Sequence, residues 1–153
     1  MSLAPGITMR EKRFRTRSVE GTLALGQTLA EILRPPMLVI LRGEVGAGKT
    51  TLVKGIAAAL GAAVEEDVTS PTFTLVHEYE NEKVHLFHLD LYRLETEEQI
   101  AVLGLEEMLA EPNALVLVEW GERFESVIKL ASGEIAMEQG DGDMRGLLVR
   151  WRA

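Results

Sequence analysis

The sequence contains no cysteine, which excludes a disulfide framework and any metal site built on thiolate ligands. It also has no apolar run close to the ~20 residues that a membrane-spanning helix needs. The basic residues near its start lead into no apolar stretch of the kind found in a signal peptide. We therefore expect a cytoplasmic protein with no membrane partner.

Positive charge is in short supply, because 16 lysines and arginines stand against 24 acidic residues and give a net charge of −8. A chain this acidic is poorly suited to holding a phosphate backbone by itself, so we expect any contact with nucleic acid to run through a partner. One local exception is the alternation of Arg13, Arg15 and Arg17. We interpret it as the exposed face of a strand, with contact to RNA as the alternative.

The chain does have enough apolar residues, 46% of 153, to build one domain with one core over residues 1–153. Continuous apolar runs at 37–41 and 114–118 predict strands buried on both faces. Helices are predicted at 19–33, 49–60 and 95–109, the last with a break at Gly104. Further strands are expected at 12–17, 72–79 and 83–90, and two more flank the turn 140–143, the last of them at 147–151.

A glycine-rich loop follows the first apolar strand. Residues 43–50 read Gly-Glu-Val-Gly-Ala-Gly-Lys-Thr and match the phosphate-loop pattern G-x-x-x-x-G-K-[ST], with a strand before and a helix after it. We expect the backbone at Gly43, Gly46, Ala47 and Gly48 to surround nucleotide phosphates at the positive end of the following helix. The sequence thus predicts an α/β fold, a three-layer P-loop NTPase sandwich with a mixed, mostly parallel sheet.

The side chains that follow the loop suit ATP bound with Mg²⁺. Lys49 is expected to neutralise the β- and γ-phosphate oxygens, and the Thr50 hydroxyl is a natural Mg²⁺ ligand. Thr51 can add a second hydroxyl on the α-phosphate side.

Two acidic residues complete this site. Glu119 follows the apolar strand 114–118, so we expect it beside the Mg²⁺, bound directly or through water; the alternative is an ordinary charge at a strand end. Asp90 ends a strand on whose face it alternates with Leu86 and His88. It is predicted to orient or deprotonate the attacking water, and the alternative is a cap for the next helix. Segment 70–74 is a candidate switch that senses the γ-phosphate, or else only a turn.

Together, four segments resemble the TsaE family, the ATPase component of bacterial tRNA threonylcarbamoyladenosine biosynthesis. They are the phosphate loop 43–51, Ser-Pro-Thr-Phe-Thr-Leu at 70–75, His-Leu-Asp-Leu-Tyr-Arg at 88–93 and Val-Glu-Trp at 118–120. The resemblance implies slow ATP hydrolysis with Mg²⁺ and two partners, TsaB and TsaD, whose complex modifies an adenosine of tRNA. ATP turnover by this subunit would reset that complex, and tRNA would be reached only through it.

The resemblance also implies roles for single residues. It makes Asp90, Lys49 and Thr72 catalytic, with Thr72 as the switch hydroxyl. It assigns Mg²⁺ binding to Thr50 and Glu119, and it places Thr22 near the nucleotide base. The nucleotide-binding set is then Gly43, Gly46, Ala47, Gly48, Lys49, Thr50, Thr51 and Thr22.

Other P-loop classes fit less well. A small-molecule kinase usually carries a lid with several arginines, but Arg93 is the only arginine between Arg42 and Arg123. A GTPase would need an Asn-Lys-x-Asp segment, which is absent. A binding module without catalysis remains an alternative that Asp90 and Glu119 together disfavour.

Overall fold

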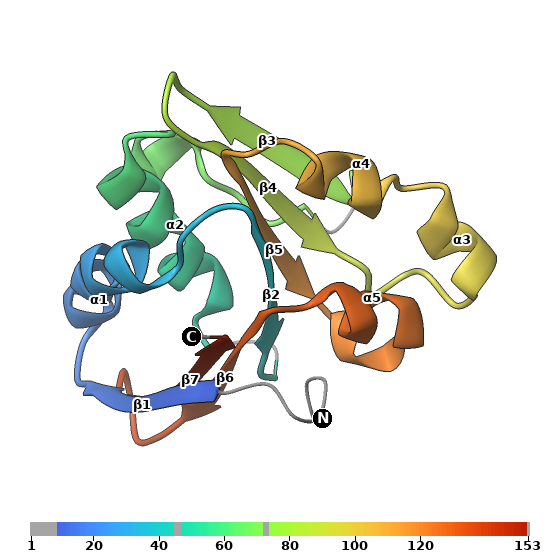
Figure 1. Cartoon of the computed structure of the whole chain (residues 1–153). Helices are drawn as coiled ribbons and strands as arrows, with labels where there is room; N and C mark the ends of the chain where they lie inside the picture. Colours follow the sequence, from blue (N-terminus) through green and yellow to red (C-terminus); the bar gives the residue numbers. More distant parts are fainter. Residues whose placement is uncertain (1–8, 45–46, 72–73, 153) are drawn as a thin grey trace.

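The computed structural model describes residues 9–44, 47–71 and 74–152. Within these residues one sheet of seven strands has the order β1-β7-β6-β2-β5-β4-β3 (Figure 1). The strands are β1 (Met9–Thr16), β2 (Met37–Arg42), β3 (Val76–Glu80), β4 (His85–Asp90), β5 (Ala114–Glu119), β6 (Gly133–Gln139) and β7 (Arg145–Arg152).

The centre of the sheet is parallel, since β6, β2, β5 and β4 pair side by side in the same direction. The flanking pairs β1–β7, β7–β6 and β4–β3 are antiparallel. The predicted mixed sheet is therefore confirmed, with its parallel part in the middle. The two apolar runs form the central strands β2 and β5, as expected for strands that are covered on both faces.

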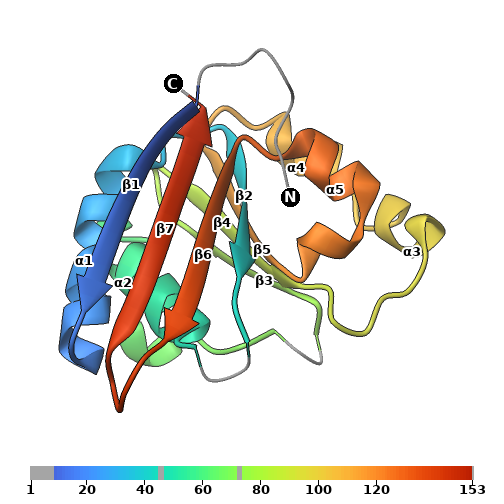
Figure 2. The same cartoon turned by 90° about the horizontal axis from the view of Figure 1, so that it is seen from below.

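Helices cover both faces of the sheet and make three layers (Figures 1 and 2). On one face lie α1 (Val19–Ile32) and α2 (Lys49–Leu60); on the other lie α3 (Glu97–Ala101), α4 (Leu105–Leu109) and α5 (Glu125–Leu130). The chain also forms two short 3₁₀ turns. Turn η1 (Glu65–Asp67) follows α2, and turn η2 (Gly121–Arg123) precedes α5. An apolar core lies on each face of the sheet, and the alternating side chains of β2 contribute to both. Val39 and Leu41 pack on the α1–α2 side, and Leu38 and Ile40 pack on the other side.

Local signals set most helix ends where the sequence predicts them. The Ser18 hydroxyl accepts a hydrogen bond of 2.9 Å from the Gly21 backbone N–H and caps α1. Helix α2 runs over the predicted residues and stops at Gly61. Gly104 separates α3 from α4 with φ +76°, a left-handed value that glycine adopts without strain.

Strands β1 and β7 begin earlier than the predicted 12–17 and 147–151, and β3 and α5 differ from the expectation as well. Strand β3 begins at Val76, because Leu75 has φ +69° and its N–H bonds to the Pro71 carbonyl at 2.7 Å; positions 72 and 73 of the predicted strand lie outside the described residues. Helix α5 has no counterpart among the predicted elements. It has only six residues and no side-chain cap, and it is stabilised by the burial of Val127 in the core beneath it.

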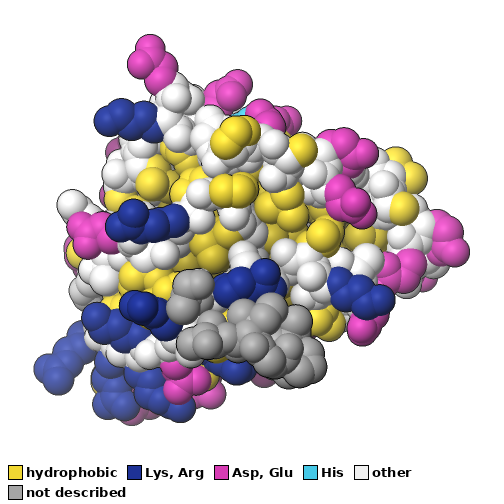
Figure 3. All heavy atoms as spheres, viewed as in Figure 1, with side chains coloured by type: hydrophobic (Ala, Val, Ile, Leu, Met, Phe, Trp, Pro, Cys, Tyr) yellow, Lys and Arg dark blue, Asp and Glu magenta, His cyan; other side chains and the backbone are white. Residues whose placement is uncertain are grey.

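The surface separates charge by region. In Figure 3, Lys and Arg side chains gather around β1, whereas Asp and Glu side chains lie along the β3–β4 end and around α3 and α4. Arg13 and Arg15 are exposed on β1, which agrees with the predicted strand face. Within the part of the chain that the structure describes, no helix is long and apolar enough to cross a membrane.

Candidate nucleotide and metal site

The phosphate loop joins the end of β2 to the start of α2. Gly48 precedes the helix with φ +100°, a conformation that a residue with a Cβ rarely adopts. Because Gly48 carries no side chain, no side-chain cap competes for the first N–H groups of α2, which carry the positive end of the helix dipole. Ala47 is buried and Gly43 begins the loop, whereas Gly46 lies outside the described residues.

Lys49 is the first residue of α2 and is buried. Its Nζ donates a hydrogen bond of 2.6 Å to the Gly43 carbonyl and lies 3.5 Å from Oε1 of Glu119. The same nitrogen stands 4.9 Å from the ring centre of Trp120, which holds a left-handed conformation with φ +67°. Strained non-glycine residues of this kind concentrate at functional sites. The loop lysine is thus aimed at the loop itself and at the predicted metal ligand.

Glu119 and Asp90 lie side by side at the carboxyl ends of β5 and β4, where they are register partners. Both are buried, at 5% and 6% exposure, so these carboxylates face the interior of the site and not bulk solvent. Oδ1 of Asp90 accepts a hydrogen bond of 3.0 Å from the Tyr92 backbone. The next helix is capped by Thr96 with a reciprocal bond from Gln99, so capping is not the task of Asp90.

The available donors fit Mg²⁺. Thr50, in the first turn of α2, and Glu119 offer hard oxygen ligands. No group of three or more His, Asp or Glu side chains able to hold a metal occurs within the described ranges. Mg²⁺ commonly takes one or two protein oxygens and fills its octahedron with water and substrate phosphates, so two ligands suit it well. Thr51 follows Thr50 in the same turn of α2.

Thr72, the predicted switch hydroxyl, lies outside the described residues. Thr22 is buried, and its hydroxyl bonds to the Thr16 hydroxyl at 2.8 Å and to the Ser18 carbonyl at 3.3 Å. These bonds tie the end of β1 to the start of α1, and contact of Thr22 with the base stays a prediction.

The structure adds contacts of two residues to which the sequence analysis assigned no role. Nε2 of His88 lies 2.6 Å from Oε2 of Glu119, inside the core. Nε of Arg145, on β7, donates to the Ala47 carbonyl at 2.8 Å and so ties the C-terminal hairpin to the phosphate loop. Arg145 is 98 positions from Ala47, so no sequence signal marked this contact, whereas the period-two alternation with Asp90 did place His88 on the right face.

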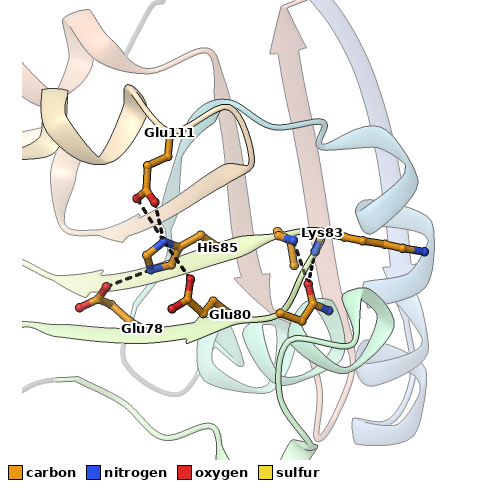
Figure 4. Close-up of polar contacts among 7 residues, drawn as sticks. Glu78, Glu80, Lys83, His85 and Glu111 are labelled. Atoms are coloured by element: carbon orange, nitrogen blue, oxygen red, sulfur yellow. Dashed lines mark hydrogen bonds and ion pairs between the residues drawn. The ribbon is translucent and has the colours of Figure 1, made fainter.

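A second histidine lies at the opposite end of β4 (Figure 4). Nε2 of His85 lies 2.9 Å from Glu78, and Nδ1 lies 3.1 Å from Glu111 and 3.6 Å from Glu80. Burial lowers the pKa of His85, but hydrogen bonds to Glu111 and Glu78 and the charges of Glu111 and Glu80 outweigh it, and the pKa is raised above its ordinary 6.5. Its ring stacks on Phe87, on the opposite face of β4 from His88.

The chain is similar to known proteins over most of its length. The sequence profile of the family described as "Threonylcarbamoyl adenosine biosynthesis protein TsaE" matches residues 16–146. The chain is similar to the tRNA threonylcarbamoyladenosine biosynthesis protein TsaE of Nostoc, with 45% identity over 68% of this chain and 64% of that protein. It is also similar to TsaE of Bacillus subtilis, with 35% identity over 90% of this chain and 84% of that protein.

The fold has a solved counterpart as well. The crystal structure of YdiB from Bacillus subtilis superposes with a TM-score of 0.72 and 28% sequence identity, covering 95% of this chain and 88% of that one. The profile match extends over most of the chain and includes the phosphate loop, β4 and β5 with their acidic ends. The chain therefore belongs to the TsaE family of threonylcarbamoyl adenosine biosynthesis proteins.

Proposed function

We propose that this protein is a Mg²⁺-dependent ATPase that works with TsaB and TsaD homologues in the threonylcarbamoyladenosine modification of tRNA. The observation that carries the proposal is the convergence of Lys49, Glu119 and Asp90 around the start of α2. Lys49 lies 3.5 Å from Glu119, and Glu119 is the register partner of Asp90. A cation, a metal ligand and a base within one buried corner are what ATP hydrolysis by a P-loop protein requires.

Each residue has a defined task in this proposal. Thr50 and Glu119 would hold Mg²⁺, which when bound supplies charge neutralisation at the phosphates. Lys49 would exchange its contacts with Gly43 and Glu119 for phosphate oxygens as ATP binds. Asp90 would orient a water molecule for attack on the γ-phosphorus and accept its proton as the bond to ADP breaks, releasing ADP and phosphate.

The positions of two arginines in this protein argue against the kinase alternative. Arg123 donates to the carbonyls of Leu91, Tyr92 and Leu94 at 2.7, 2.9 and 3.1 Å, so its guanidinium is occupied in holding the segment after β4. Arg145 is bound to the Ala47 carbonyl. Neither side chain is placed on a mobile lid that would clamp a transferred phosphate.

A slow ATPase with no acceptor site makes sense when a partner uses the cycle. Leu75, which follows the predicted switch segment 70–74 in the chain, lies next to Asp90, since the Asp90 N–H bonds to the Leu75 carbonyl at 3.0 Å. Nucleotide state can therefore bias this segment and, through it, a docking surface. The basic surface around β1 and the acidic surface around α3 and α4 are candidate contacts for TsaB and TsaD.

The experiment is a pull-down of TsaB and TsaD homologues with this protein, with and without ATP, followed by multiple-turnover modification of tRNA in a reconstituted mixture. We expect tighter association with ATP, ATPase stimulation by the pair, and no support of multiple turnovers by Lys49→Ala. Many cycles of modification without this protein, or with Lys49→Ala in its place, would refute the proposal.

A further inference from the structure

We propose that His88 is a positioning residue that fixes the Glu119 carboxylate in the orientation needed for Mg²⁺. This inference rests on the proposed ATPase function and adds a residue to its metal site. His88 is wholly buried, and its ring reaches Glu119 from the neighbouring strand β4.

The two oxygens of Glu119 have different partners. Oε2 lies 2.6 Å from Nε2 of His88, and Oε1 lies 3.5 Å from Nζ of Lys49. A carboxylate only accepts hydrogen bonds, so Nε2 is the donor, and its short bond holds Oε2 toward β4. Oε1 is thereby turned toward the phosphate loop, where a Mg²⁺ or its water would meet it once Lys49 moves to the phosphates.

Among the described residues, the rest of the imidazole ring forms no hydrogen bond that would explain a histidine here. Nδ1 of His88 is buried and has no hydrogen-bond partner among the described residues. A buried acceptor without a donor is destabilising, and the neighbouring positions on this face, Val84 and Leu86, are apolar core residues. An apolar side chain would therefore satisfy the core better, and the bond to Glu119 is what the histidine supplies.

Ligand-orienting bonds of this kind are a general property of metal sites. A ligating carboxylate that is held by a hydrogen bond from behind loses less freedom when the metal binds, and removal of such a partner typically weakens metal affinity about 10–100-fold. His88 would act on Mg²⁺ through Glu119 and would touch neither the nucleotide nor the attacking water. The expected signature is a change in Mg²⁺ requirement with little change in nucleotide affinity when Mg²⁺ is absent.

The test compares two amides of different reach at position 88. The amide nitrogen of His88→Gln lies close to the place of Nε2 and can still donate to Glu119, whereas that of His88→Asn is too short. His85→Gln, on the same strand but outside the site, is the matched control. Calorimetric titration of ATP at a fixed pH, over a series of free Mg²⁺ concentrations and in EDTA, gives both affinities, and thermal unfolding checks that each variant is folded.

We expect His88→Asn to need about 10–100-fold more Mg²⁺. His88→Gln and His85→Gln should stay near the parent, and all four proteins should agree in EDTA. If His88→Asn keeps the parent's Mg²⁺ requirement, or if His88→Gln loses as much as His88→Asn, the inference is overturned while the proposed function stands. If the parent itself shows no Mg²⁺-dependent ATP binding, the proposed function fails first and this inference with it.

Discussion

The two ends of β4 carry the same pair of side chains, a histidine with glutamate, in very different surroundings. His88 is fully buried and meets one carboxylate, Glu119, which is itself only 5% exposed. The glutamates around His85 have side chains that are between 45% and 66% exposed. Three residues apart on one strand, the rings point to opposite faces of the sheet.

The difference shows how burial decides what such a pair does. At the buried carboxyl end a single hydrogen bond fixes the carboxylate that we propose as a Mg²⁺ ligand. At the exposed amino end three carboxylates from β3 and the segment after α4 surround one ring and hold these elements to β4 (Figure 4). We therefore expect changes at the carboxyl end to alter catalysis and changes at the amino end to alter stability.

The largest effect is expected from Asp90→Asn at the carboxyl end. An amide cannot accept the proton of the attacking water, and general base catalysis is commonly worth at least about 100-fold in rate. ATP affinity should change little, because in the proposal Asp90 acts on the attacking water and holds neither the phosphates nor Mg²⁺. Phosphate release and calorimetric ATP binding check both points, and hydrolysis at the parent rate would show that Asp90 is only a structural residue.

A smaller effect, in metal binding, is expected from Glu119→Gln. A neutral amide is a poorer ligand for a hard cation than a carboxylate, so the Mg²⁺ concentration that supports half-maximal hydrolysis should rise at least about tenfold. Saturating Mg²⁺ should restore part of the rate. A rate that is equally low at every Mg²⁺ concentration would instead indicate a role for Glu119 outside metal binding.

At the amino end, His85→Gln should lower the free energy of unfolding by about 1 kcal/mol near neutral pH, because its partners are largely exposed and solvent screens them. Urea unfolding measures this change. Hydrolysis of ATP by the same variant should match the parent, and a loss of activity without a loss of stability would break the division between the two ends of β4.

The pH dependence of that loss has a defined sign. The pKa of His85 is raised in the folded protein, so the folded state holds this proton more tightly than the unfolded chain. Its stabilisation is fully present below pH 6.5, the ordinary value, and is lost as the pH rises through the folded pKa. The difference between parent and His85→Gln should therefore be larger at about pH 6 than at about pH 9. A difference that grows with pH would contradict the assignment.

The smallest effects separate the glutamates of this cluster. Glu111 hydrogen-bonds Nδ1 of His85 at 3.1 Å, whereas Glu80 acts only through its charge at 3.6 Å. Glu111→Gln should therefore lower the His85 pKa more than Glu80→Gln, and each should change the free energy of unfolding by less than about 1 kcal/mol. NMR titration of the His85 ring in the two variants measures the change in its pKa. An equal change in both variants would contradict the larger contribution expected from Glu111.

The parts of the fold that the sequence predicts are those in which local pattern and burial agree. The apolar runs that form β2 and β5 need no tertiary information, and neither do the Ser18 cap or the Gly61 stop of α2. The short helix α5 could not be predicted, because its six residues are helical only through packing against the sheet.

In the candidate site, the residues that belong to sequence motifs could be predicted, whereas the contacts between distant residues could not. Lys49 comes from the phosphate-loop motif, and Asp90 and Glu119 each end a predicted strand. These patterns predict one shared site, and the structure places Lys49 beside Glu119 and Glu119 beside Asp90. The bonds from His88 to Glu119 and from Arg145 to Ala47 span 31 and 98 positions and depend on strand order, which spacing does not encode. For Thr22, the sequence could not reveal that its hydroxyl is bonded to Thr16 in the core.

The most direct test of the account is phosphate release from ATP by the parent and by Lys49→Ala, each with Mg²⁺ and with EDTA. Lys54→Ala is the matched control, because Lys54 lies in the same helix α2 and forms no ion pair among the described residues. We expect Mg²⁺-dependent hydrolysis by the parent and by Lys54→Ala, and a rate at least about 100-fold lower for Lys49→Ala, because this variant lacks the cation that the proposal places against the phosphates. Equal rates for Lys49→Ala and Lys54→Ala, or a parent rate that persists in EDTA, would contradict the central claim that the edge formed by Lys49, Glu119 and Asp90 is the catalytic site.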